Sequence, residues 1–198
     1  VDASLGKFDF IIVHGIYSWV TEDVRSKILS VCKENLSRDG IAYVSYNTLP
    51  GWNMVKTVRD MMMYHAGSFD DPVAKILEAR RMLNFTSENC SGGETPYKQM
   101  LESEVDMVSK FPDNYLFHDH LEHQNAPCYF HEFVERVAGV GLQYLGDARL
   151  SSMYVGNFSD KAREILGQIN DLVRQEQYLD FLTNRRFRAS LLCHQDVE

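Results

Sequence analysis

The sequence lacks the features that mark membrane proteins and secreted chains. No apolar run approaches the roughly 20 residues that are needed to cross a bilayer. No basic segment followed by an apolar one opens the chain, so a secretory signal peptide is not indicated. The composition also excludes disorder, collagen-like repeats and coiled coil. We therefore expect a folded protein that makes no contact with a membrane.

Positive charge and paired cysteines are also scarce. Lysine and arginine number 20 against 28 aspartate and glutamate residues, which gives a net charge of -8. Such a chain repels phosphate backbones, so we expect no broad binding to nucleic acid. No C-x-x-C pair occurs among the four cysteines, which are Cys32, Cys90, Cys128 and Cys193. This usage predicts reduced thiols in a cytoplasmic protein.

The apolar content is sufficient for a core. The chain has 198 residues, of which 44% are hydrophobic. This length predicts one domain, or one domain with a large insertion. Val1 stands only a few residues before a hydrophobic strand, so we expect the sequence to begin inside a domain.

The opening predicts a strand, a helix and a second strand. Phe8 to Val13 (FDFIIV) is an apolar run that predicts a strand buried on both faces. Thr21 is a suitable N-cap for a helix that Asp39-Gly40 would end. Ile41 to Tyr46 (IAYVSY) predicts a second buried strand. This order indicates a βαβ unit with parallel strands, and hence an α/β fold.

Helices are predicted for most of the remaining chain. Apolar residues recur at helical spacing from Asn53 to about His65, and the pairs Asp71-Pro72 and Thr95-Pro96 begin further helices. Ser87 to Glu94, which contains Gly92-Gly93, predicts a mobile loop.

The last third predicts two more strands. A helix over Tyr129 to Ala138 precedes a third strand over Leu142 to Leu145. One long helix is predicted from Ser159 to Asn184, and Phe187 to Cys193 predicts the last strand.

Two aromatic loops follow predicted parallel strands at their carboxyl ends. They are His14 to Trp19 (HGIYSW) and Tyr46 to Trp52 (YNTLPGW). Ligands bind at this edge of open α/β sheets, which makes the loops a candidate site. The alternative is that Trp19 and Trp52 are only large packing residues.

Histidines gather between His118 and His131, with Cys128 among them. Histidine, cysteine and carboxylate side chains are the usual zinc ligands, so a metal-dependent helical protein is one alternative. The spacing is poor, since His118 and His120 would lie on different sides of a helix and no H-E-x-x-H pattern occurs. We expect capping and interfacial histidines here, and no metal site.

Several of these segments resemble a known family. FDFIIVHGIYSW, the turn from Leu36 to Gly40 and IAYVSYNTLPGW resemble the fourth and fifth strands of a class I S-adenosylmethionine-dependent methyltransferase. YFHEFVERVAGVGLQYL resembles a later helix and strand of that fold, and Phe187 to Cys193 its antiparallel seventh strand. NYLFHDHLEHQNAPCYFHEF and EQYLDFLTNRRFRASLLCH are similar to the predicted methyltransferase regulatory domain of bacterial methyltransferases, of which some are protein-lysine methyltransferases.

The resemblance implies the C-terminal half of a Rossmann-like methyltransferase sheet, strands 4, 5, 6 and 7, with a large helical insertion. It divides the chain into a partial core (1–70), a helical insertion or regulatory domain (71–128), a return to the core (129–150), a second helical insertion (151–186) and a last core strand (187–198). A helical lid or a dimerisation element fits the insertion equally well.

The implied cofactor is S-adenosylmethionine, with His14 and Gly15 beside it. The family's glycine-rich first loop, and the acidic residue that ends its second strand, are missing from this sequence. We therefore expect the C-terminal part of a larger methyltransferase, which alone binds the cofactor poorly and is inactive.

The implied acceptor is a protein lysine, which must be neutral to attack. An apolar, aromatic site favours the neutral amine by desolvating the ammonium, and aromatic faces favour the positive methyl-transfer centre. By this reading Tyr17, Trp19, Tyr46 and Trp52 line the site, and Asn47 accepts a hydrogen bond from the amine.

Two further expectations concern partners. The chain could instead be a non-catalytic regulatory or dimerisation module of a methyltransferase. A strand over Phe8 to Val13 without its neighbour would expose an apolar edge that pairs with another chain, so we expect a homo-oligomer.

Overall fold

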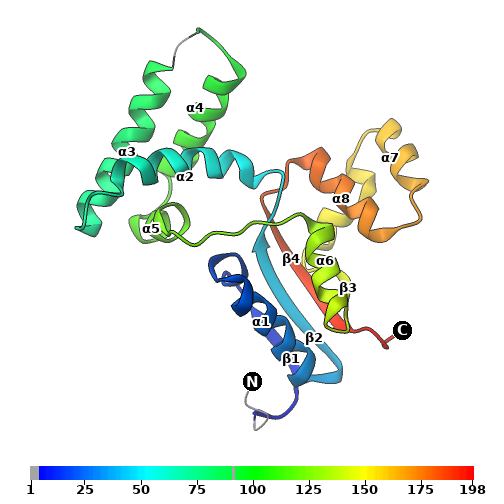
Figure 1. Cartoon of the computed structure of the whole chain (residues 1–198). Coiled ribbons are helices and arrows are strands. Elements are labelled where there is room, and N and C mark those ends of the chain that lie inside the picture. The colour runs from blue at the N-terminus through cyan, green and yellow to red at the C-terminus, as the bar shows by residue number, and fades with distance from the viewer. Residues whose placement is uncertain (1–4, 91) are drawn as a thin grey trace. The chain divides into compact units, whose positions relative to one another are not determined.

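The computed structural model describes residues 5–90 and 92–198 (Figure 1). Their contacts form two compact units. The sheet unit contains Val1–Trp52 and Gln124–Glu198, and the helical unit contains Asn53–His123. The helical unit thus begins at Asn53, whereas the resemblance placed the start of the insertion at 71.

A four-stranded sheet in the order β1-β2-β4-β3 is the centre of the sheet unit. The strands are β1 (Phe8–Val13), β2 (Leu36–Asn47), β3 (Leu142–Asp147) and β4 (Phe187–His194). β1 pairs with β2 in parallel, and β4 runs antiparallel to both β2 and β3. The predicted α/β class, the βαβ opening and the antiparallel last strand are confirmed.

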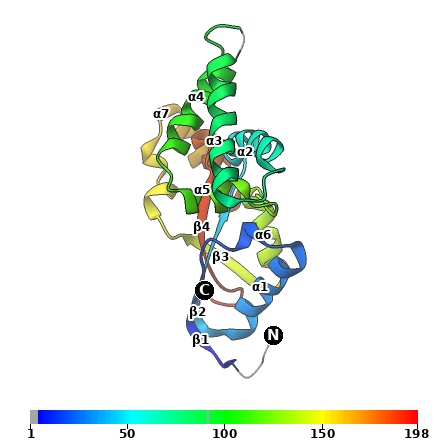
Figure 2. The ribbon, with the colours of Figure 1, turned by 90° about the vertical axis from the view of Figure 1, so that its left-hand side faces the viewer.

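One face of the sheet is covered by α1 (Glu22–Asn35) and α6 (Phe130–Gly139), which lie on the same side in both views (Figures 1 and 2). The core beneath them combines β-branched and aromatic side chains from the strands with apolar residues of the helices. Its fully buried members include Leu29, Val44, Phe133 and Leu192.

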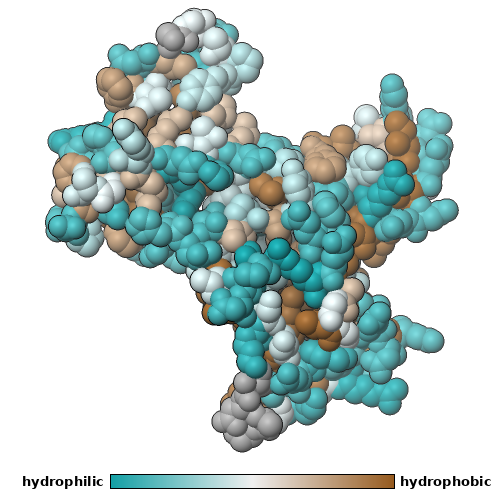
Figure 3. Space-filling model, viewed as in Figure 1, coloured by the Kyte–Doolittle hydropathy of each residue, from teal (hydrophilic) through white to brown (hydrophobic). Residues whose placement is uncertain are grey.

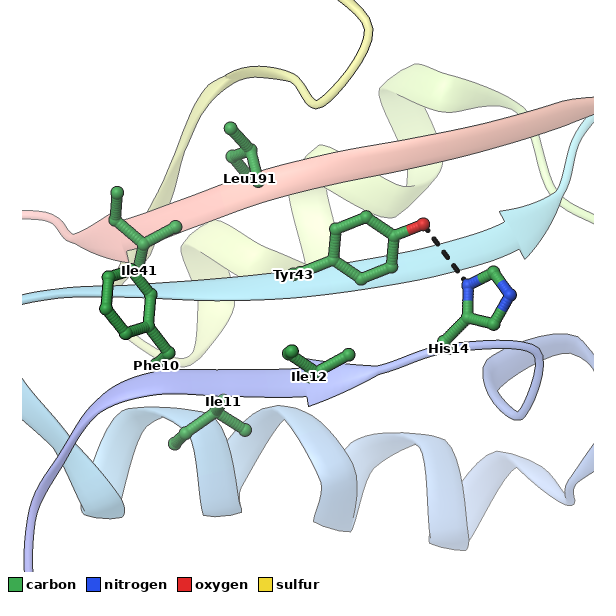
Figure 4. Close-up of a pocket in the computed structure, with 7 residues that line it drawn as sticks. All are labelled: Phe10, Ile11, Ile12, His14, Ile41, Tyr43 and Leu191. Carbon is green, nitrogen blue, oxygen red and sulfur yellow. Dashed lines mark hydrogen bonds between the residues drawn. The ribbon is translucent and has the colours of Figure 1, made fainter.

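The opposite face of β1 is open, so the prediction of a strand buried on both faces is wrong. Phe10 and Ile12 are each 73% exposed, while Ile11 between them points to α1 (Figure 4). β1 is an edge strand of the sheet that the structure describes. Among the described residues, no helix covers Phe10 and Ile12 on this face.

The first helix ends earlier than Asp39-Gly40 predicted. α1 stops at Asn35, and Leu36 already belongs to β2 because its side chain is fully buried in the core. The pairing with β1 is irregular here, since Phe8 faces Leu36 while Phe10 faces Ile41. The segment from Leu36 to Gly40 is therefore an extension of the strand.

The single helix predicted from Ser159 to Asn184 is two helices. α7 (Asp160–Gly167) and α8 (Leu172–Thr183) each have their own N-cap, because Ser159 accepts from the Ala162 N–H and Asp171 from the Arg174 N–H. Short 3-10 turns, η3 (Leu150–Met153) and η4 (Val155–Asn157), connect β3 to α7.

In the described part of the helical unit there are four helices: α2 (Trp52–Ala66), α3 (Pro72–Asn89), α4 (Pro96–Ser109) and α5 (Asp113–Leu121). The predicted caps are confirmed, with Asp71 accepting from the Ala74 N–H and Thr95 from the Lys98 N–H. The unit has its own core, which includes Val58, Met62, Leu83, Leu101 and Leu116. The mobile loop predicted over Ser87 to Glu94 is in part the end of α3, and residue 91 lies outside the described residues.

None of the helices in the described ranges is both long and apolar enough to span a bilayer.

Candidate functional site

The two aromatic loops meet at one edge of the sheet. The rings of Trp19 and Trp52 pack edge to face, with centroids 6.2 Å apart and planes at 80°. The Asn47 N–H donates to Ser18 Oγ over 2.8 Å, which joins the loops directly. Parallel pairing explains the meeting, because β1 and β2 end at the same edge.

A third segment, Asn125 to Cys128, forms hydrogen bonds with both loops. The Ala126 N–H donates to the Ser18 carbonyl over 2.8 Å, and Thr48 Oγ1 donates to the Cys128 carbonyl over 3.0 Å. Asn125 Oδ1 accepts from the indole N–H of Trp52 over 2.7 Å. These contacts preorganise the two tryptophans on a rigid base.

The second loop also lies tightly against the segment before β4. A Cβ atom at Gly51 would stand 2.1 Å from the carbonyl oxygen of Asn184, so only glycine fits. The Gly51 N–H donates to the Arg185 carbonyl over 3.0 Å. This close approach brings the chain before β4 to the same edge.

Tyr17 does not line the edge where the two aromatic loops meet, contrary to the expectation. Its side chain has no exposed surface and packs edge-on against Tyr46 and Phe133, at centroid distances of 6.1 and 5.4 Å. Burial raises the pKa of its hydroxyl, and the Arg136 guanidinium opposes this shift. Tyr17 and the equally buried Tyr46 are core residues that support the loops from beneath.

Asn47 and Trp52 lie between the buried core and the edge of the sheet where the two aromatic loops meet. Asn47 is 4% exposed, and its Nδ2 atom has no hydrogen-bond partner among the described residues. A buried amide group without a partner is uncommon in folded proteins. Trp52 is only 6% exposed and Trp19 is half-buried, so Trp19 presents more of its surface to a ligand.

His14 and Gly15 stand directly after β1. His14 Nδ1 lies 3.2 Å from the Tyr43 hydroxyl and 3.2 Å from Ser45 Oγ (Figure 4). The Gly15 N–H donates to the same Ser45 Oγ over 2.9 Å, with Gly15 at a φ of 68° that favours glycine. The expected pair is thus held by two hydroxyl groups of β2, which the sequence analysis did not select.

Two hollows share His14 and Tyr43 on the open side of the sheet. The first, of about 400 Å³, is apolar and lined by Phe10, Ile12, Ile41 and Leu191 as well (Figure 4). The second, of about 600 Å³, which we call the polar hollow, has charged groups on its walls. Its other lining residues include Asp147, Arg149, Ser152, Arg185 and Phe187. The polar hollow lies where β1, β2 and β3 end and β4 begins, which is the ligand-binding edge of an open α/β sheet.

A buried charge cluster beside the polar hollow was not predicted. Arg188 on β4 is fully buried, and its guanidinium reaches Asp147 Oδ2 at 2.5 Å, Glu176 Oε2 at 2.9 Å and Asp180 Oδ2 at 2.9 Å. Arg185 adds contacts to Asp180 at 2.9 Å and to Asp147 at 3.1 Å. The Arg188 guanidinium also lies 4.0 Å above the Phe130 ring. These contacts tie α8, β3 and β4 together.

The cluster holds three carboxylates against two guanidinium groups. Burial raises the pKa of Glu176 and of Asp180, and Arg188 opposes the shift in both. Loss of water around the carboxylates accounts for most of this direction, and the negative charge of Asp147 adds a smaller contribution of the same sign.

Replacing Glu176 by glutamine is expected to remove a pH-dependent loss of stability. A carboxyl with a raised pKa in the folded chain adds stability that is complete below its ordinary pKa, 4.5 here, and is lost as pH rises through the raised value. The variant lacks this loss, so its free energy of unfolding should rise relative to the parent as pH increases above 4.5. Urea unfolding of both proteins at several pH values measures the difference. A difference that stays constant with pH would contradict the assignment.

The histidine-rich segment shows no metal centre. Across residues 5–90 and 92–198, no three histidine, cysteine or acidic side chains are grouped so that they could hold a metal ion. Burial raises the pKa of the Cys128 thiol to about 12, which disfavours a thiolate ligand. His131 instead meets Gln177 Oε1 at 3.0 Å, and His120 packs against Phe111. The structure gives the metal-dependent alternative no support.

The residues at this edge fit one side of a cofactor site. His14 and Gly15 end a parallel strand beside a hollow, as the ends of such strands do where nucleotide cofactors bind. A glycine-rich loop between a strand and a helix, which would cradle the rest of such a cofactor, does not occur in this sequence.

The chain is similar to known proteins in sequence and in fold. Residues 112–194 match the family described as a predicted methyltransferase regulatory domain. A protein of Rickettsia prowazekii (strain Madrid E) is 52% identical over 100% of this chain, which covers 36% of that protein. The solved structure of PKMT2 from Rickettsia typhi matches 100% of this chain at 45% identity, with a TM-score of 0.89, over 37% of that chain.

A second structure of PKMT2 from Rickettsia typhi, in complex with AdoHcy, matches equally well, with a TM-score of 0.89 and 45% identity over 38% of its chain. The chain therefore spans little more than a third of these relatives. The predicted resemblance and fold class are confirmed: the described sheet and helices have the fold of part of PKMT2 from Rickettsia typhi.

Proposed function

We propose that this chain, whose residues 112–194 carry a methyltransferase regulatory domain, is the C-terminal part of an S-adenosylmethionine-dependent methyltransferase that modifies protein lysines. The main support is the pairing of Trp19 with Trp52 at the ends of β1 and β2, within a fold that matches the AdoHcy-bound PKMT2. The polar hollow beside His14 provides space for a reacting group at the same edge.

The proposed roles follow from the contacts. Trp19 and Trp52 offer aromatic faces to a cationic acceptor and shield it from water. Asn47 contributes a buried carboxamide, and we assign its Oδ1 to accept a hydrogen bond from the acceptor amine. His14 and Gly15 stand beside the cofactor, which when bound supplies an electrophilic methyl group on sulfur. Tyr17 has no contact with the substrate in this proposal, because it is buried.

Methyl transfer to protein tests the proposal. The protein, as its gene encodes it, is incubated with isotopically labelled S-adenosylmethionine and a panel of acidic and basic proteins, and methyl-lysine is identified by mass spectrometry. We expect label in lysine of at least one protein. Label in another residue type, or only in a small molecule, would overturn the lysine assignment. If the folded protein transfers no label to any molecule, the proposal that it is a methyltransferase is wrong.

A non-catalytic regulatory or dimerisation module is the second candidate. It is favoured by apolar side chains on the surface over α7 and α8 (Figure 3), of which Ile165, Leu172, Phe181 and Leu182 are each at least 44% exposed. Such a module would change the activity of a separate catalytic chain without transferring methyl groups itself. The assay above distinguishes the two. In either case we place the protein in the cytoplasm, because all four cysteines are free.

We also propose that the chain self-associates through β1. The exposed Phe10 and Ile12 lie on an edge strand with unpaired backbone groups, and such edges pair with other chains. Residues 1–198 should scatter light as a dimer or larger species, and Ile12→Lys should shift the mass toward the monomer. A parent that is monomeric at high concentration would contradict this. An oligomer unchanged by Ile12→Lys would point to the apolar surface of α7 and α8.

A further inference from the structure

His14 is placed to exchange a proton at the ligand-binding edge. The side chain is exposed and stands at the boundary of the apolar and polar hollows. One ring nitrogen, Nδ1, faces the Tyr43 hydroxyl, while the second points away from Tyr43 (Figure 4). The Phe187 ring lies edge-on at 6.4 Å and limits the movement of the imidazole.

The hydrogen bonds at Nδ1 decide what the second nitrogen can do. Ser45 Oγ and the Tyr43 hydroxyl each lie 3.2 Å from Nδ1, and each oxygen can accept a hydrogen bond from an Nδ1–H group. Ser45 Oγ accepts from the Gly15 N–H and has a second lone pair with which it can also accept from Nδ1. With the proton on Nδ1, the Nε2 lone pair is available to a ligand.

The other titratable groups around the polar hollow are poorer proton acceptors. Arg149 and Arg185 carry guanidinium groups, which offer hydrogen-bond donors and no acceptor. Asp147 is engaged by Arg185 at 3.1 Å and by Arg188 at 2.5 Å, and its Oδ1 accepts from the Ala189 N–H. Tyr43 in its neutral form is a weak base. Among the described residues that line this hollow, His14 is the best proton acceptor.

We infer that His14 Nε2 accepts a proton from the acceptor ammonium, and that Tyr43 and Ser45 are positioning residues for its ring. The inference rests on the proposed function. The lysine Nζ–H bond breaks and its proton forms a bond to Nε2, which gives a neutral amine and an imidazolium. The Nζ lone pair then forms a bond to the methyl carbon, and the carbon–sulfur bond breaks with its electron pair remaining on sulfur. His14, being exposed, returns the proton to water.

The proton transfer requires help from the aromatic pair. The ordinary pKa of a lysine is about 10.4 and that of a histidine about 6.5, so transfer between them is disfavoured by roughly 10⁴. Desolvation of the ammonium beside Trp19 and Trp52 lowers its pKa and reduces this imbalance. A positioned general base typically contributes about 10²–10⁴ in rate.

The first test is the pH profile of methyl transfer by the encoded protein. His14→Asn keeps an amide near the position of Nδ1 but has no acceptor in place of Nε2. We expect kcat to fall by about 10²–10⁴ with little change in KM. In the parent, acid should lower the rate because an imidazolium cannot accept a proton, and this dependence on pH should be absent from the variant. His123→Gln, a change at an exposed histidine of the helical unit, is the matched control and should keep the parent's profile.

The second test needs no catalysis. Nitrogen-15 NMR of labelled histidines should show the His14 ring with its neutral proton on Nδ1, and Tyr43→Phe with Ser45→Ala should shift the proton toward Nε2. A parent ring protonated on Nε2, or a His14→Asn variant with the parent's kcat and pH profile, would overturn the inference. If the parent transfers no methyl group, the proposed function is wrong. The NMR result is independent of that outcome, because it reports which ring nitrogen of His14 carries the proton.

Discussion

Replacing Arg188 by methionine is expected to lower the free energy of unfolding by about 3–5 kcal/mol. The methionine leaves Asp180 and Glu176 buried without the guanidinium that contacts both. Arg185 still reaches Asp180 and Asp147, but no contact from Arg185 to Glu176 compensates for the loss. Since whole domains are stable by only about 5–15 kcal/mol, this variant should melt at a much lower temperature. Urea unfolding at neutral pH measures the change.

Arg149→Met is the matched control for that experiment. Arg149 lines the polar hollow beside the Arg188 cluster but is exposed, and the described residues place no carboxylate in an ion pair with it. Its replacement should change stability by about 0.5 kcal/mol or less. Equal losses in the two variants would show that the buried cluster has no special part in holding α8 to the sheet.

Replacing Trp19 by alanine is expected to reduce methyl transfer by about 10²-fold in kcat/KM. The change removes one of two aromatic faces and frees Trp52 to move, so the acceptor loses both its desolvating wall and its alignment. Asn47→Ala should also lower the rate, because it deletes the buried amide at the end of β2. Radiolabel transfer under single-turnover conditions measures the chemical step.

Two controls separate a local effect from unfolding. Tyr64→Ala removes an aromatic side chain that is 90% exposed on α2, and it should stay within twofold of the parent. Trp19→Phe keeps an aromatic face and should recover part of the rate. If Trp19→Ala and Asn47→Ala both turn over within twofold of the parent while remaining folded, the two loops are not the acceptor site.

The sequence predicted the strands well because their apolar runs are short and end at polar or glycine residues. Phe8–Val13 was predicted to the residue, and proline after aspartate or threonine located the starts of α3 and α4. The failures arose where tertiary contacts outweigh local signals. Leu36 begins β2 because its side chain enters the core, although the turn residues Asp39-Gly40 come later.

The burial of Tyr17 and the exposure of Phe10 were also beyond local reasoning. Both are aromatic residues near β1, and the pattern of residues along the chain does not say which face of the sheet receives helices. α1 and α6 both pack on the Tyr17 face, and α6 comes from a segment more than a hundred residues away. Only the complete topology distinguishes the two positions.

The charge cluster was missed because its members are distant in the sequence. Glu176 and Asp180 are four residues apart on α8, a spacing that puts both on one face, and this was the available signal. Arg188 and Asp147 come from two antiparallel strands whose register, Asp147 opposite Ser190, brings them together. The Tyr43 and Ser45 hydroxyls were missed for the same reason, since alternation along β2 places both beside His14 only when β1 pairs in parallel.

The most direct measurement is the position of an acceptor lysine in a complex of the encoded protein with AdoHcy and a substrate peptide. We predict that the lysine Nζ lies against the Trp19 and Trp52 rings, within hydrogen-bonding reach of His14 or Asn47. A lysine bound at the helical unit, or on the face of the sheet that α1 and α6 cover, would contradict the account.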